Sequence, residues 1–77
     1  MKYKSSEILQ LIKEGKKTSK EIIIAMFNFK RSEAKTSNPK YSRYYIPLTI
    51  KLKEMEREGV ISRIANASEY ELYIKRK

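Results

Sequence analysis

The chain contains no cysteine, no histidine and no tryptophan. Without cysteine it can form neither a disulfide framework nor a thiolate metal site. Without histidine it lacks the most common general base and metal ligand. Only two glycines occur in 77 residues, so a glycine-rich loop that cradles phosphate groups is excluded as well. We therefore expect no metal, no cofactor and no enzymatic activity.

Long apolar runs are missing too. The longest one, residues 22–27, is far shorter than the roughly 20 residues that cross a bilayer. The basic start of the chain is not followed by the apolar segment of a signal peptide. These absences predict a cytoplasmic protein that does not enter a membrane, and no pattern points to a small-molecule ligand. The absence of cysteine and the abundance of Lys, Glu and Ile would also suit a thermophilic source.

What the chain has in excess is positive charge. The 18 Lys and Arg residues exceed the 9 Asp and Glu residues and give a formal net charge of +9. Such an excess favours an anionic partner, with nucleic acid ahead of a membrane surface. A length of 77 residues suffices for one small domain, which we place at residues 1–77, with a compact core rather than a deep pocket.

Apolar residues at helical spacing predict a first helix that begins at Ser5 or Ser6 and ends at Gly15. The two lysines that follow form a short connector with at most one or two residues of strand.

The second helix is predicted to begin at a capping box formed by Thr18 and Glu21. In this motif the threonine hydroxyl accepts a hydrogen bond from the Glu21 amide, and the Glu21 carboxylate accepts one from the Thr18 amide. The helix ends either near Asn28 or at about Ala34. Residues 30–43 look the least ordered and carry a local charge of +4. They form either a solvated loop or a basic arm along a phosphate backbone.

A third helix organises the rest of the chain. Leu48, Leu52 and Met55 are spaced by four and three residues, so they lie on one stripe that faces a core. Because proline is tolerated mainly in the first turn of a helix, Pro47 predicts a start between residues 44 and 46. Gly59 ends the helix. The outer face then carries the side chains of Ile46, Ile50, Lys53 and Arg57.

Two strands follow, at about residues 60–65 and 69–75, joined by the polar turn 66–68. The second alternates, with Tyr70, Leu72 and Ile74 on the side expected to be buried. Since a two-stranded hairpin is marginal alone, it should pack on the helices. The fold class is therefore α+β.

Four motifs follow one another along the chain: Ile8-Leu9-x-Leu11-Ile12-x-x-Gly15, Thr18-x-x-Glu21-Ile22, Leu48-x-x-x-Leu52-x-x-Met55-x-x-x-Gly59-Val60-Ile61 and Tyr70-x-Leu72. Together with the order of three helices and a hairpin, they resemble the winged helix-turn-helix family, with the hairpin as the wing. The chain also loosely resembles PadR and MarR regulators, without an added dimerisation helix.

The resemblance implies a transcriptional regulator that binds double-stranded DNA, as a possible homodimer, with its third helix in the major groove. Residues on that helix and just before it would read bases: Arg43, Tyr45, Ile46, Thr49, Ile50 and Lys53. Hydroxyl and cationic groups elsewhere would hold phosphates: Thr18, Ser19, Lys20, Lys30, Arg31, Lys40, Arg63 and Lys75.

Two other functions remain open at this point. A winged helix can serve as a protein-interaction module, and exposed Ile46 and Ile50 would then form part of an interface. The positive charge is equally compatible with RNA. Tyr44 and Tyr45 could also simply pack beneath the preceding loop, and the outer face of the third helix could be an ordinary solvated surface.

Overall fold

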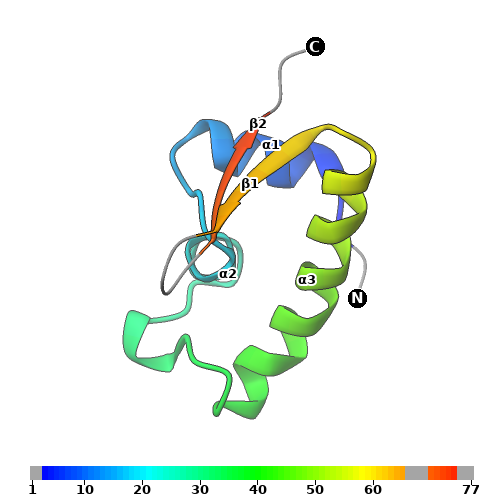
Figure 1. Ribbon diagram of the computed structural model, residues 1–77. Helices are drawn as coiled ribbons and strands as arrows, with labels where there is room; N and C mark the ends of the chain where they lie inside the picture. Colours follow the sequence, from blue (N-terminus) through cyan, green and yellow to red (C-terminus); the bar gives the residue numbers. More distant parts are fainter. Residues whose placement is uncertain (1–2, 66–69, 75–77) are drawn as a thin grey trace.

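The computed structural model describes residues 3–65 and 70–74. Three α-helices, with a short 3-10 helix between the second and the third, are followed by a two-stranded antiparallel hairpin (Figure 1). This order confirms the α+β class and is compatible with the layout of a winged helix. The elements are α1 (Ser5–Lys13), α2 (Ser19–Phe27), η1 (Arg31–Glu33), α3 (Pro39–Arg57), β1 (Ile61–Ala65) and β2 (Tyr70–Ile74).

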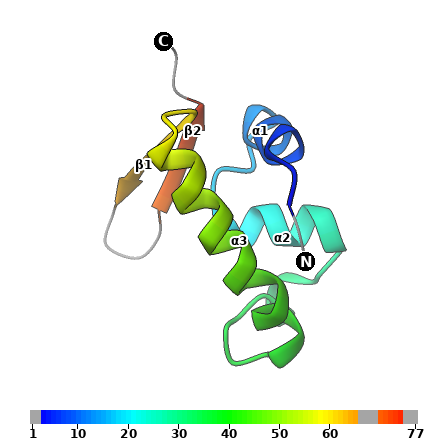
Figure 2. The ribbon, with the colours of Figure 1, turned by 90° about the vertical axis from the view of Figure 1, so that its right-hand side faces the viewer.

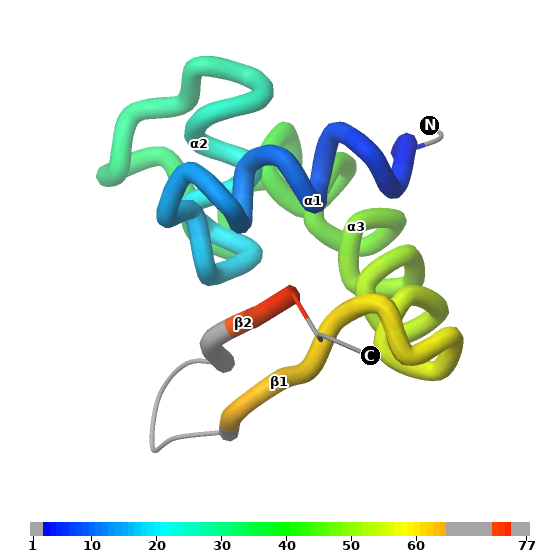
Figure 3. Tube along the Cα trace, turned by 90° about the horizontal axis from the view of Figure 1, so that it is seen from above, coloured from blue at the N-terminus to red at the C-terminus, as the bar shows by residue number. Residues whose placement is uncertain are grey.

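Every α-helix and both strands contribute to one core. α2 packs against α1 and α3, β1 lies against α3, and β2 lies against α1. Figure 3 shows α3 along one flank of the molecule, with the hairpin beside its C-terminal end. The stripe predicted for the third helix is buried as expected. The largest fully buried side chains are Ile8, Ile22, Ile23, Leu48, Met55, Ile61 and Leu72.

Both glycines end helices, as predicted. Gly15 has φ +102 and Gly59 has φ +78, the left-handed region that side chains with a Cβ rarely adopt. After α1, the amides of Gly15 and Lys16 donate to the carbonyls of the last helical turn at 3.0 and 2.8 Å. After α3, the amides of Gly59 and Val60 do the same at 3.1 Å each. These paired bonds satisfy carbonyls that a helix end leaves free.

The predicted capping box at Thr18 is half formed. Its hydroxyl accepts from the Glu21 amide at 3.1 Å, as expected, and so begins α2. The Glu21 carboxylate, however, accepts from the Thr18 hydroxyl at 3.2 Å rather than from the Thr18 amide. Of the two ends left open for α2, the structure has the earlier one, because Asn28 adopts the left-handed conformation at φ 56.

The predicted start of the third helix was wrong. α3 begins at Pro39, not between residues 44 and 46. The Asn38 side chain explains this earlier start, since its oxygen accepts from the Lys40 amide at 3.1 Å and its NH₂ group donates to the Glu33 carbonyl at 3.0 Å. Proline in the first helical turn has its φ already set for a helix. Asparagine and proline therefore begin a helix here, within the segment that was predicted to be the least ordered.

Pro47 consequently lies inside α3. A proline there has no N–H to donate to the Arg43 carbonyl, and its ring crowds that carbonyl. The next carbonyl, that of Tyr44, accepts a hydrogen bond of 2.7 Å from the Tyr3 hydroxyl. The N-terminal segment thus contacts α3 within one turn of the residue that disturbs its hydrogen bonding.

The segment before α3 and the first turn of α3 are anchored in the core rather than merely solvated. Ala34 and Tyr41 are buried, as is the preceding Phe29. The rings of Phe27 and Tyr44 stack with their centroids 4.0 Å apart. Part of the segment predicted to be least ordered is therefore core, and the expectation that Tyr44 and Tyr45 could pack beneath it is consistent with their partial burial.

The hairpin pairs Ile61 with Ile74 and Arg63 with Leu72. Leu72 is buried as predicted, but Ile74 is 41% exposed. The amide of Leu72 donates to the Lys17 carbonyl at 2.7 Å. The connector between α1 and α2 was expected to hold at most one or two residues of strand. Among the described residues it forms no strand, and this backbone hydrogen bond joins it to β2. The predicted turn 66–68 lies outside the described residues.

Candidate nucleic-acid interface

One face of α3 carries a continuous row of exposed side chains, which we call the α3 stripe. Its members are spaced by three or four residues, so the five from Arg43 to Arg57 lie on one side of the helix, opposite the buried stripe, and Lys40 lies at the edge of that side. The row covers about 25 Å at 1.5 Å per residue. Figure 2 views the molecule with α3 in front of α2. The α3 stripe consists of Lys40, Arg43, Ile46, Ile50, Lys53 and Arg57.

Two carboxylates of α3 pair with cations that lie outside the α3 stripe. Nearby ion pairs use other residues: Lys51 lies 3.5 Å from Glu54, and Arg63 lies 3.3 Å from Glu56. Across residues 3–65 and 70–74, the stripe cations form no ion pair. The Lys40 ammonium lies 5.9 Å from the centroid of the Phe29 ring, a weak contact that leaves its charge intact. Four positive charges therefore remain available to an anion.

The centre of the α3 stripe is apolar. Ile46 is 60% exposed and Ile50 is 62% exposed, the two highest values among the exposed large hydrophobic residues. They are four residues apart, hence one helical turn. An apolar pair framed by cations on both sides is the feature that distinguishes this face from an ordinary solvated helix surface.

Of the six predicted base-reading residues, the structure brings Arg43, Ile46, Ile50 and Lys53 together on the α3 stripe. The other two, Tyr45 and Thr49, are half-buried beside it.

The Tyr45 ring stacks on Tyr41 at a centroid distance of 5.5 Å. The Thr49 hydroxyl donates to the Tyr45 carbonyl at 2.9 Å, so toward a ligand it acts as an acceptor.

The predicted phosphate-binding residues do not form one surface. Lys40 belongs to the α3 stripe, whereas Lys30 and Arg31 are exposed at the start of η1, in the segment that leads into the N-terminal end of α3 (Figure 1). Arg63 is half-buried and paired with Glu56. Lys75 lies outside the described residues.

At the start of α2, Ser19 and Lys20 are half-exposed. Thr18 is buried, and its hydroxyl both accepts from the Glu21 amide and donates to the Glu21 carboxylate. Arg57 was not among the predicted site residues, although its spacing of four from Lys53 indicated the same face. The α3 stripe is therefore the strongest candidate for a nucleic-acid contact.

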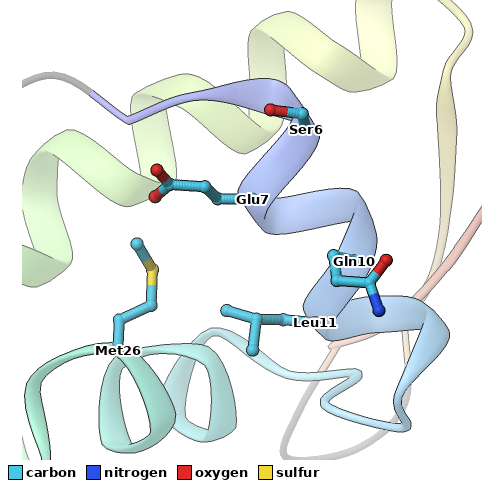
Figure 4. A pocket seen from close by; sticks show the side chains of 5 residues that line it. All are labelled: Ser6, Glu7, Gln10, Leu11 and Met26. Carbon is cyan, nitrogen blue, oxygen red and sulfur yellow. The ribbon is translucent and has the colours of Figure 1, made fainter.

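A shallow groove of about 440 Å³ between α1 and α2 was not predicted. In Figure 4 the Met26 side chain of α2 points toward α1, while Ser6, Glu7, Gln10 and Leu11 line the other side. Leu11 and Met26 give it an apolar part, and none of its lining residues is Lys or Arg. The groove therefore does not suit a phosphate backbone.

Within the described parts of the chain, no helix combines the length and the hydropathy needed to cross a membrane. No group of three or more acidic side chains gathers there in a way that could hold a metal ion. Comparisons with protein-family models, curated proteins and solved structures found no match to this chain.

Proposed function

We propose that the chain binds double-stranded DNA in the major groove through the α3 stripe and acts as a transcriptional regulator. The observation that carries this proposal is the row of four cations along the exposed side of α3, none of which forms an ion pair within residues 3–65 and 70–74. A B-DNA major groove is about 12 Å wide and admits an α-helix. A row about 25 Å long therefore extends past both groove edges, so that its outermost members can contact phosphates while its centre faces base edges.

The arrangement around α3 supports the same proposal. α2 packs behind α3, and β1 begins just after it, so the helix is held along its length while its outer face stays open. This is the arrangement that a winged helix-turn-helix uses to present its third helix. The proposal also includes a contact from the hairpin and a homodimer on a palindromic site. Only the resemblance to winged helix-turn-helix proteins supports these two parts.

Two alternatives differ in what they require. A double-stranded RNA partner fits less well, because the A-form major groove is deep and too narrow for side chains to read. A protein partner would have to match Ile46 and Ile50 with apolar groups and the surrounding cations with carboxylates. The exposure of this isoleucine pair keeps a protein partner as the second candidate.

Salt dependence of binding to a 20-base-pair random duplex tests the proposal. Each neutralised phosphate contributes about −0.9 to the slope of log affinity against log salt, so four stripe contacts give a slope of about −4. Fluorescence anisotropy between 50 and 200 mM KCl measures it. The double variant Lys40→Ala with Lys53→Ala should reduce the slope by about two units.

A matched control removes the same charge elsewhere. Lys13 and Lys16 are exposed and lie outside the α3 stripe, so Lys13→Ala with Lys16→Ala should leave the slope unchanged. Equal losses in the two double variants would indicate diffuse attraction rather than an interface on α3. An affinity that does not vary with salt would overturn the nucleic-acid proposal altogether.

A further inference from the structure

The centre of the α3 stripe consists of two side chains that can neither donate nor accept a hydrogen bond. Ile46 and Ile50 point out from the same side of α3 and lie about 6 Å apart along its axis. Successive base pairs of B-DNA are about 3.4 Å apart, so this separation is close to two base steps. Their spacing thus fits two apolar groups on base pairs that have one other base pair between them.

The surroundings of the pair are nearly symmetric. Counted from the midpoint between the isoleucines, Arg43 and Lys53 each lie five residues away. Lys40 and Arg57 lie eight and nine residues away. These distances correspond to about 7 Å and 12–14 Å along the axis. These cations would repel a second copy of this chain, which carries its own charge of +9. An anionic surface with apolar groups at its centre is the complementary partner.

The major groove offers one apolar group, the methyl on C5 of thymine, and 5-methylcytosine carries the same group. We infer that Ile46 and Ile50 make α3 a reader of C5-methyl groups, and that its preferred DNA carries methylated pyrimidines at two positions about two base steps apart. This inference rests on the proposed function.

Replacing thymine by uracil in a selected binding site tests this assignment, because uracil keeps the base-pairing edge and the O4 acceptor and loses only the methyl. We expect the affinity to fall about fourfold for each of two methyl groups, and about 15-fold for both. In the converse experiment, 5-methylcytosine in place of cytosine at either position should raise the affinity about fourfold.

Matched variants tie the effect to the isoleucines. Ile46→Ala with Ile50→Ala should still bind duplex DNA with an unchanged salt slope, since all four stripe cations remain. It should no longer distinguish thymine from uracil. Ile64→Ala removes an isoleucine of similar exposure from β1 and should keep the wild-type discrimination.

The outcomes separate the inference from the function on which it rests. Salt-dependent duplex binding with equal affinity for thymine and uracil sites would overturn the methyl reading and leave DNA binding intact. Discrimination that persists in the double isoleucine variant would also overturn it. No duplex binding under any condition would remove the proposed function itself and leave the isoleucine pair as evidence for a protein partner.

Discussion

Tyr3 provides a sharp test of how the N-terminal segment is held. The residue is only 8% exposed, its hydroxyl donates to the Tyr44 carbonyl at 2.7 Å, and its ring meets Phe27 edge-on at 6.2 Å. Burial, and then the proximity of the Tyr44 phenol, raises the pKa of Tyr3 from 10.0 to about 12. The folded protein therefore holds the phenolic proton more tightly than the unfolded chain does.

The sign of the pH dependence follows from this difference. Because the folded pKa lies above the unfolded one, the stabilisation is fully present below pH 10 and is lost as the pH rises through 12. At pH 11 the unfolded phenol is mostly ionised and the folded one mostly neutral, so the loss is about 1.4 kcal/mol. The full two-unit shift corresponds to roughly 2.7 kcal/mol.

The variant Tyr3→Phe keeps the ring and removes both the hydrogen bond and the titration. Near pH 8 we expect it to be less stable than the wild type by about 0.5–1.5 kcal/mol, the usual contribution of one hydrogen bond. As the pH approaches 11 this difference should shrink to about zero, and above it the variant should be the more stable protein. Urea unfolding at intervals from pH 8 to 11.5 measures the crossing. If the free energy of unfolding differed between the wild type and the variant by the same amount at every pH, the burial of this hydroxyl would be refuted.

Three further changes test the core, the cap and the helix end. Leu52→Ala should lower the free energy of unfolding by about 2–5 kcal/mol in urea melts, because it leaves a cavity, whereas Ile50→Ala on the exposed side should change it by no more than about 0.5. Thr18→Ala removes the hydroxyl that caps α2 and should cost about 1 kcal/mol. Gly59→Ala should also cost about 1–2 kcal/mol in the same assay. A Cβ there would meet nothing within 4 Å, so the whole effect would come from the backbone at φ +78.

Local signals in the sequence predicted most of the element boundaries. Thr18, Gly15 and Gly59 each act through a bond or a dihedral angle within a few residues of themselves, so their neighbours in sequence sufficed to identify them. The alternation after Gly59 predicted the hairpin in the same way. Ile74 was assigned to a buried face by alternation, yet it is 41% exposed, because burial depends on what lies across from a strand and not on the strand alone.

The start of α3 depended on contacts that the sequence does not display. Pro47 inside a helix costs about 3 kcal/mol, which is why a later start was predicted. In the structure the Asn38 cap contributes about 1 kcal/mol, and burial of the Tyr41 ring contributes about 1.5–3 kcal/mol. The two together are of the same size as the proline cost. Burial of Tyr41 requires Phe29, twelve residues earlier, so the compensation is a tertiary effect.

The earlier start also changes what the candidate site contains. A helix that began at residue 44 would leave Lys40 and Arg43 in a loop, with no fixed relation to Lys53 and Arg57. Because α3 begins at Pro39, all four cations have fixed positions along one helix, and the isoleucine pair lies at the middle of the row rather than at its end. Pro47 lies within this row and weakens the backbone hydrogen bonding of the helical turn that joins the two halves of the row. The Tyr3 hydroxyl donates to the Tyr44 carbonyl in that same turn. The N-terminal segment thus packs on α3 at the turn between the two halves of the face proposed to meet DNA.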